Sequence, residues 1–187
     1  MRIIHTEAEF TGRASVVALG MFDGVHIGHQ ALIRQAVALA RELAAESVVC
    51  TFDRHPLAVV KPEFAPKPLL TLEENLEKFA RLGADWALVK AFTRAYAATP
   101  PEEFIERLVM EMRVKAIVVG ENYSFGAGGR GGPGMIRDMA AKLDYRAVIV
   151  PPVLDGEVMC SSTRIRGLLA KGETEHARRL MALEDDA

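Results

Sequence analysis

Two histidines three residues apart follow a pair of glycines at the start of a helical pattern. They are His26 and His29, in the segment Gly20-Met-Phe-Asp-Gly-Val-His-Ile-Gly-His29. Residues three apart on a first helical turn face the same side, so both imidazoles can contact one group of a ligand. Glycines let a ligand approach the backbone, and the free N–H groups of a helix N-terminus attract anions. The segment therefore indicates a nucleotide triphosphate site, where both rings donate to a reacting phosphoryl group.

Other interpretations of the histidine pair stay open. Zinc binding would need further ligands, and neither a cysteine pair nor another histidine-rich tract supplies them, so we expect no metal site on the protein. The two rings could also be ordinary surface residues at a helix start. The segment does not match the GxGxxG dinucleotide pattern. GxxxxGK[ST] is absent as well, which excludes P-loop NTPases.

A second polar cluster is Ser161-Ser-Thr-Arg-Ile-Arg166, which precedes a C-terminal helical pattern. Its three hydroxyl residues are favoured N-caps, so a plain helix start would explain them. The two arginines, Arg164 and Arg166, argue against that, because cations are unfavourable at the positive end of a helix. Hydroxyls, N–H groups and a guanidinium together suit a polyphosphate. We therefore favour phosphate binding, with Arg164 directed away from the site.

Strand-like and helix-like patterns alternate along the chain and must position these clusters. Short apolar runs predict strands at 15–19, 47–52, 85–92, 114–120 and 146–150. Periodicity and capping signals predict helices at 31–46, about 71–82, from about 99, at 135–143 and about 163–181, the last interrupted at Gly172. This order predicts one domain over residues 1–187, of α/β class with a Rossmann-like, doubly wound, mostly parallel sheet. Met21 and Trp86 are expected in its core.

Two connections between these elements are unusual. The proline-rich stretch 56–68 is long for a βα connection and is a candidate binding loop. The stretch 126–134 is rich in glycine, and it either closes over substrates or is simply flexible. The acidic residues at 184–186 are expected to form a solvated tail.

The composition limits the classes of function. The 187 residues carry a net charge of −2, which offers no basic field for a nucleic acid. Two cysteines, Cys50 and Cys160, cannot form a secreted disulfide scaffold. No apolar run approaches the roughly 18 residues of a membrane span, and the charged N-terminus does not fit a signal peptide. We expect a soluble cytoplasmic protein that binds neither membrane nor nucleic acid. The sequence does not decide the oligomeric state, for which a monomer is the default expectation.

The two polar clusters also resemble a known pair of motifs. His26-Ile-Gly-His29 and Ser161-Ser-Thr-Arg-Ile-Arg166 are similar to the HxGH and SSTxxR motifs of the class I nucleotidyltransferase superfamily. Further segments resemble the FMN adenylyltransferase domain of prokaryotic FAD synthetases, over about 15–181. They are Gly20 to His29, Thr51-Phe-Asp-Arg-His-Pro56, Leu70-Thr-Leu-Glu-Glu74, Gly120-Glu-Asn-Tyr-Ser-Phe-Gly126 and the continuation from Arg164 to Gly172. The chain departs from that family at Arg54, usually proline, at Asn75, often lysine, and at Asn122-Tyr123.

This resemblance implies a sheet of the HxGH nucleotidyltransferase type and a reaction of ATP with FMN that gives FAD and pyrophosphate. Magnesium would bridge phosphate oxygens, with no protein ligand identified. The resemblance implies catalytic roles for His26, His29 and Arg166. The residues expected at the ATP site are Gly20, Phe22, Asp23, Gly24, Gly28, Gly120, Ser161, Ser162 and Thr163.

Flavin binding is expected just past two strand ends, where ligands of open α/β sheets bind. The expected residues are Phe52, His55, Pro56, Asn122 and Phe125. Phe52 and Phe125 could alternatively be core residues. No riboflavin kinase barrel follows the matching region, so a separate riboflavin kinase is expected elsewhere. Two other functions stay open: nucleotidyl transfer to a different small phosphate ester, and non-catalytic binding of a flavin nucleotide.

Overall fold

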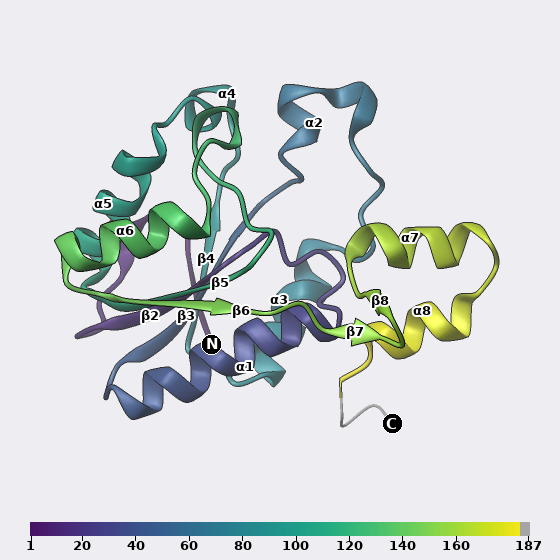
Figure 1. Cartoon of the computed structure of the whole chain (residues 1–187), viewed down its shortest axis with the longest axis horizontal. Helices are drawn as coiled ribbons and strands as arrows, with labels where there is room; N and C mark the ends of the chain where they lie inside the picture. The colour runs from purple at the N-terminus through teal and green to yellow at the C-terminus, as the bar shows by residue number, and fades with distance from the viewer. Residues whose placement is uncertain (184–187) are drawn as a thin grey trace.

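Six parallel strands form the centre of the computed structural model, which describes residues 1–183 (Figure 1). They are β1 (Arg2–Ile4), β2 (Ser15–Leu19), β3 (Glu46–Phe52), β4 (Trp86–Lys90), β5 (Val114–Gly120) and β6 (Arg146–Val150). Their order in the sheet is β1-β4-β3-β2-β5-β6. The prediction of a Rossmann-like α/β fold is confirmed. The acidic stretch 184–186, expected to be a solvated tail, lies outside the described residues.

Helices cover both faces of the sheet. Helices α1 (Ile27–Glu42) and α3 (Leu72–Arg81) pack on one face, and α5 (Pro101–Met112) and α6 (Pro133–Leu143) pack on the other. Strand β2 is therefore buried throughout, which explains its continuous apolar sequence. From β2 the chain builds outward through β3 to one side, and β5 lies on its other side. The gap between the carboxyl ends of β2 and β5 is thus the topological switch point, where such folds bind ligands.

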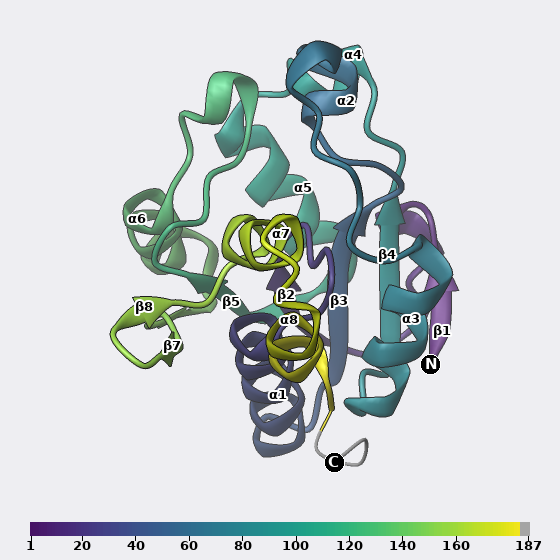
Figure 2. The same cartoon turned by 90° about the vertical axis from the view of Figure 1, so that its right-hand side faces the viewer.

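The remaining elements lie around that carboxyl edge. They are α2 (Leu57–Val60), α4 (Arg94–Ala97), α7 (Ser162–Ala170), α8 (Thr174–Met181) and the hairpin of β7 (Leu154–Asp155) and β8 (Val158–Met159). Figure 2 shows α7 and α8 stacked beside the N-terminal half of α1. A small apolar cluster joins them, in which Ile165, Leu168 and Leu180 pack with Ile27. Within residues 1–183, no helix is long and apolar enough to cross a lipid bilayer.

Helix α1 begins and ends earlier than the sequence predicts. Its N-cap is His26, whose Nδ1 accepts the backbone N–H of His29 at 3.4 Å. The chain then turns through Ala44, with φ of 50°, and β3 begins at Glu46. The prediction of a helix over 31–46 was wrong at its start because histidine is not a usual N-cap signal. It was wrong at its end because the turn uses alanine, and not glycine, at positive φ. By contrast, the capping box at the start of α3 is confirmed, formed by Thr71 and Glu74.

The first ten residues take part in the fold, although the sequence patterns did not assign them an element. Strand β1 pairs with β4, and Phe10 packs edge-on against Trp86 at 5.2 Å. Glu7 is buried and accepts a hydrogen bond from Lys90 Nζ at 2.6 Å. A three-residue strand is too short to show a period, so only the paired partner reveals it. Trp86 is in the core as expected.

Candidate active site

A cavity of about 350 Å³ opens at the switch point between β2 and β5. We call it the polar cavity. Most of the predicted catalytic and ATP-binding residues line it, together with two of the predicted flavin residues: Gly20, Asp23, His26, Gly28, His29, His55, Gly120, Asn122, Ser161, Ser162, Thr163 and Arg166. Residues far apart in the sequence therefore meet at one edge of the sheet. Met21 also lines it, half-buried, so the expectation of a core position was wrong. It follows the end of β2, where the chain leaves the sheet.

The two histidines stack against each other at the start of α1. Their ring centroids lie 3.7 Å apart, and the planes differ by 21°. Burial lowers the pKa of His26 to about 4, and burial with the neighbouring His26 holds the pKa of His29 well below its usual value. Both rings are therefore neutral at pH 7. Because Nδ1 of His26 accepts the His29 N–H, the proton of His26 resides on Nε2, as a hydrogen-bond donor.

The N-terminal turn of α7 forms another wall of the polar cavity. Ser161 is the N-cap, and its Oγ accepts the backbone N–H of Arg164 at 3.2 Å. Ser162 Oγ donates to the carbonyl oxygen of Asp23 at 3.0 Å, which ties α7 to the loop after β2. Hydroxyls and the free N–H groups of a helix start thus line the same cavity as the histidines. An anionic phosphate chain is the ligand chemistry that fits both walls.

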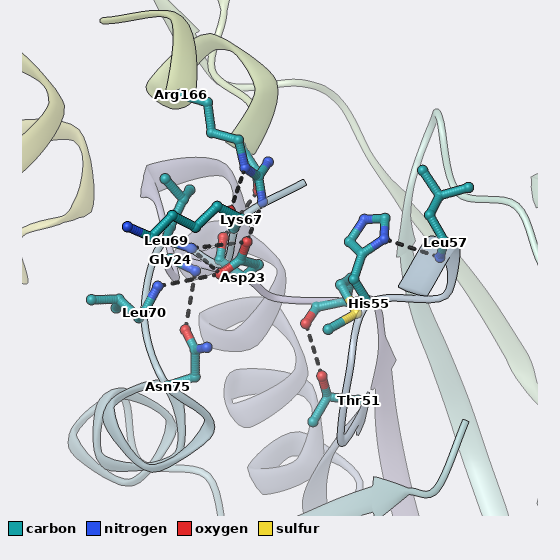
Figure 3. Close-up of polar contacts among 12 residues, drawn as sticks. Asp23, Gly24, Thr51, His55, Leu57, Lys67, Leu69, Leu70, Asn75 and Arg166 are labelled. Atoms are coloured by element: carbon teal, nitrogen blue, oxygen red, sulfur yellow. Dashed lines mark hydrogen bonds and ion pairs between the residues drawn. The ribbon is translucent and has the colours of Figure 1, made fainter. Parts of the chain in front are cut away.

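Asp23 and Arg166 form an ion pair at the edge of this cavity (Figure 3). Arg166 extends from α7, and its Nε also donates to the carbonyl oxygen of Lys67 at 2.9 Å. The Asp23 carboxylate accepts the backbone N–H groups of Leu69 at 2.9 Å and Leu70 at 3.4 Å. One carboxylate therefore links the loop after β2, the connection before α3 and helix α7. It fixes the guanidinium beside the cavity.

Two residues expected at the ATP site lie outside the cavity. Phe22 is fully buried behind the histidines, and its ring packs edge-on against His29 at 5.2 Å. Gly24 adopts φ of 83°, and its N–H donates to Asn75 Oδ1 at 3.1 Å. A Cβ there would lie 2.9 Å from Leu69 Cδ1, so only glycine fits this turn. Both residues shape the loop that carries Asp23 and the histidines.

A second cavity, of about 570 Å³, lies beside the first and has aromatic walls. We call it the aromatic cavity. It contains three of the predicted flavin residues, Phe52, Pro56 and Phe125, with Phe92, Tyr96, Phe104 and Tyr123. The rings of Phe52, Phe92 and Tyr96 form an edge-to-face triangle with centroids 4.9 to 5.8 Å apart. Phe125 also belongs to the sheet core, so its two interpretations are compatible.

The predicted flavin set is divided between the two cavities. His55 and Asn122 line the polar cavity, while the phenylalanines line the aromatic one. Tyr123 lines both, which places the cavities side by side. Burial raises the pKa values of Tyr96 and Tyr123, so both phenols stay protonated. A flat apolar ring with a phosphate attached would fit across this boundary.

The glycine-rich stretch forms part of the aromatic wall. Gly126, Gly128 and Gly129 line the cavity, and Phe125 pairs with Gly131 through two backbone hydrogen bonds of 2.9 and 3.1 Å. A further bond of 2.8 Å joins Ala127 N–H to the carbonyl oxygen of Thr99. This loop is thus held at both sides of the cavity. Whether it moves over substrates stays a prediction.

Sequence reasoning missed the aromatic residues contributed by the segment after β4. Phe92 follows the carboxyl end of that strand, and Tyr96 lies in the short helix α4. The rule that ligands bind past strand ends would have identified Phe92. No local signal identifies Tyr96, because its place in the wall depends on the packing of α4 against the loop after β3.

The comparisons with known proteins agree with this geometry. A family model described as FAD synthetase matches residues 9–164. The chain belongs to the FAD synthetase family. A bifunctional riboflavin kinase/FMN adenylyltransferase of Listeria monocytogenes is 36% identical over 179 residues, which cover 94% of this chain and 56% of that protein. The chain therefore spans about half the length of that relative.

Other similar proteins match over different shares of their length. A putative bifunctional riboflavin kinase/FMN adenylyltransferase of Geobacillus thermodenitrificans is 37% identical over 181 residues, which cover 97% of both chains. An FAD synthetase of Listeria monocytogenes is 32% identical and covers 90% of this chain and 69% of its own length. A solved structure described as a macrolide-efflux protein from Streptococcus pneumoniae superposes with a TM-score of 0.82 at 32% identity, over 96% of this chain and 60% of that one.

Proposed function

We propose that this chain transfers AMP from ATP to FMN, giving FAD and pyrophosphate. Its membership of the FAD synthetase family supports this reaction. The observation that carries the proposal is the pair of adjoining cavities that share Tyr123. One is lined with neutral donors and a helix N-terminus, which suit a triphosphate. The other has aromatic walls, which suit an isoalloxazine ring. FMN placed across the boundary would bring its phosphate to the α-phosphorus of ATP.

The proposed chemistry needs alignment more than proton transfer. An oxygen of the FMN phosphate attacks the α-phosphorus in line, a new P–O bond forms, and the bond to the β-phosphate oxygen breaks. A phosphate monoester is already anionic near pH 7, so the step requires no general base. His26 and His29, neutral because they are buried, would donate hydrogen bonds to the oxygens on which charge develops. Positioning both substrates supplies the remainder of the catalytic effect.

Arg166 and the start of α7 would hold the departing pyrophosphate. The ion pair with Asp23 already orients the guanidinium, so little reorganisation is needed on binding. Ser161, Ser162 and Thr163 line the same wall. Their hydroxyls and backbone N–H groups suit the β- and γ-phosphate oxygens. The roles of these residues at the pyrophosphate are part of the same proposal as the roles given above to the residues at each substrate.

Magnesium enters this proposal as an ion carried by the triphosphate. Among residues 1–183, no group of three or more His, Cys, Asp or Glu side chains is placed to hold a metal. Asp23, one of the carboxylates that line the cavity, is engaged by Arg166 and by two backbone N–H groups. A phosphate-bound ion that keeps its waters fits these surroundings better than a protein cage. Such an ion neutralises phosphate charge, and no step here depends on a protein ligand to it.

Two further inferences concern the setting of the enzyme. Cys50 and Cys160 are both buried free thiols, as expected in a reducing compartment, and we infer a cytoplasmic location. FMN is the phosphate ester of riboflavin, so a riboflavin-phosphorylating activity must supply the acceptor. In the bifunctional relatives that activity is named together with the adenylyltransferase.

Product analysis tests the proposed function directly. The pure protein, ATP, magnesium and FMN should give FAD and pyrophosphate in equal amounts on chromatography. Riboflavin in place of FMN is the control and should give neither FMN nor FAD. An adenylylated product from another phosphate ester, with none from FMN, would move the assignment to a different acceptor. Nucleotide binding without any product would favour a non-catalytic binding protein.

A further inference from the structure

One oxygen of a single carboxylate joins three elements next to the polar cavity. Oδ2 of Asp155, in the β7–β8 hairpin, lies 2.5 Å from Arg164 Nη2 and 2.7 Å from His176 Nε2. Arg164 belongs to the first turn of α7, and His176 belongs to α8. Partial burial opposes ionisation of Asp155, but the hydrogen bonds from His176 and Arg164 hold its pKa below the usual value. The carboxylate is therefore charged at neutral pH and can hold both partners.

The hairpin has little else to keep it in place. The side chains of Leu154, Val158 and Met159 are 55%, 53% and 39% exposed, so they bury little apolar surface. A two-stranded ribbon of this length is not stable by itself. At its base the Cys160 N–H donates to the carbonyl oxygen of Val153 at 2.9 Å. Asp155 is thus the polar anchor of the hairpin tip on the helices.

The base of this hairpin is a wall of the polar cavity. Val153, Met159 and Cys160 line the cavity directly before the N-cap of α7. Met159 Sδ also accepts a hydrogen bond from Asn122 Nδ2 at 3.2 Å, so the hairpin connects the start of α7 to the segment after β5. A shift of the hairpin would therefore open the cavity on the side where α7 begins.

Arg164 connects this wall to the phosphate-binding turn. Its backbone N–H donates to Oγ of the N-cap residue Ser161, and its side chain turns away from the cavity toward Asp155. Its Nε is buried without a hydrogen-bond partner, so the guanidinium depends on Asp155 for compensation. The carboxylate also explains how a cation is tolerated at the positive end of a helix.

We propose that Asp155 is a positioning residue, which fixes the hairpin and the first turn of α7 so that the polar cavity accepts a nucleoside triphosphate. Asp155 acts through Arg164 and His176 and does not touch the substrate. The inference rests on the proposed function where turnover is measured, because turnover requires FMN as the acceptor. The measurement of ATP affinity does not depend on the identity of the acceptor. It concerns the nucleotide cavity and leaves the aromatic cavity unaffected.

The test is the Asp155→Ala variant of the full chain. Calorimetric titration with magnesium and ATP should show affinity weakened about tenfold, the lower end of the scale for losing a hydrogen bond to a charged group. Affinity for FMN should stay within about twofold of wild type, because neither Asp155 nor its partners Arg164 and His176 line the aromatic cavity. Hydrogen exchange at the Cys160 amide should accelerate. In turnover, the ATP KM should rise more than kcat falls.

Matched variants separate positioning from general damage. Glu175→Ala removes a carboxylate of α8 that does not contact the hairpin, the partner of Arg178 at 2.9 Å on the exposed side of the helix, and should leave ATP affinity unchanged. His176→Leu should weaken ATP binding in the same direction, and His176→Gln, which keeps a donor at the same reach, should restore most of it. If Asp155→Ala does not fold, the His176 pair decides the question.

Two results would overturn the inference. One is wild-type ATP affinity in Asp155→Ala, or in His176→Leu when that variant decides. The other is an equal loss of ATP and FMN affinity, which would indicate general destabilisation. Failure of the proposed function is distinguishable from both: a wild-type protein that makes no FAD would reject the acceptor, while a selective loss of ATP binding in the variant would still support the positioning role.

Discussion

The polar and aromatic cavities adjoin, but their walls are built in different ways. In the polar cavity, helix starts and side-chain hydrogen bonds hold the donors, as His26 does at α1 and Ser161 at α7. In the aromatic cavity, rings from separate segments position one another by edge-to-face contact, such as Phe52 and Phe92 at 4.9 Å. Local motifs therefore specify the first, and tertiary packing specifies the second. Variants in the two cavities should accordingly damage different kinetic constants.

Among these variants, His29→Ala should show the largest difference between the loss of kcat and the loss of FMN affinity. Loss of one preorganised donor at a reacting phosphoryl group should lower kcat by roughly 10²-fold or more. The ring lies in the polar cavity, so FMN affinity should barely change. Steady-state kinetics with a fluorescence titration of FMN measures both quantities. His5→Ala, which changes a histidine outside both cavities, is the control. Near-wild-type turnover in His29→Ala would show that the ring is structural.

A pH titration of stability should report on the polar cavity and not on the aromatic cavity. Burial lowers the pKa of His26 to about 4, so between pH 6.5 and 4 the unfolded chain binds a proton that the folded chain does not. The contribution of this ring to the free energy of unfolding is therefore at its full value above pH 6.5, and it falls as the pH drops toward 4. A shift of this size corresponds to a loss of about 3 kcal/mol from this ring.

His26→Asn is the variant for that measurement, because asparagine does not titrate and is a good N-cap. Urea unfolding at several pH values should give a shallower slope than the wild type between pH 6.5 and 4. A slope equal to that of the wild type would mean that other groups cause the acid destabilisation. The phenols of the aromatic cavity do not titrate in this range, since burial raises the pKa values of Tyr96 and Tyr123.

The same contrast explains what the sequence could predict. Strands β2 and β5 have the predicted bounds because continuous apolar runs record burial on both faces. Both polar segments that line the polar cavity were found from the sequence because the residues of each are close together in the chain. The division of the flavin residues was not predictable, since His55 and Pro56 are neighbours in sequence yet line different cavities.

Local sequence patterns also could not predict the ion pairs around the site. Asp23 and Arg166 are far apart in the chain, and their contact exists only once α7 packs beside the loop after β2. The partner of Arg164 also could not be identified, although its misfit at a helix N-terminus indicated that one was needed. Strand β1 required knowledge of its neighbour β4. Sequence periodicity reports burial, whereas these features depend on pairing.

Substitution of Arg166 should have a smaller effect on turnover than substitution of His29, and the effect should be divided between the ATP KM and kcat. A guanidinium on the pyrophosphate binds ATP and binds more strongly as negative charge builds up on the leaving group, so Arg166→Ala should raise the ATP KM and lower kcat together, by about tenfold to thirtyfold in kcat/KM. Arg166→Lys should restore only part, because lysine lacks the planar fork. Asp23 would lose its partner in the alanine variant, so the ATP affinity of Asp23→Asn separates the two roles. Full activity in the lysine variant would exclude a two-pronged contact.

The smallest effect, and the sharpest test of the comparison, belongs to the aromatic cavity. Phe92→Leu keeps an apolar side chain but removes a ring that contacts Phe52 and Tyr96, at 4.9 and 5.8 Å. The lost ring contact is worth on the order of 1 kcal/mol, so the FMN KM should rise about fivefold. The ATP KM and kcat at saturating FMN should be unchanged, since Phe92 does not line the polar cavity. Met110→Leu is a control for a general apolar change, because this residue is exposed on α5 at 75%. A rise in the ATP KM equal to that for FMN would show that the two cavities act as one site, and the separation between phosphate chemistry and ring binding would then have to be abandoned.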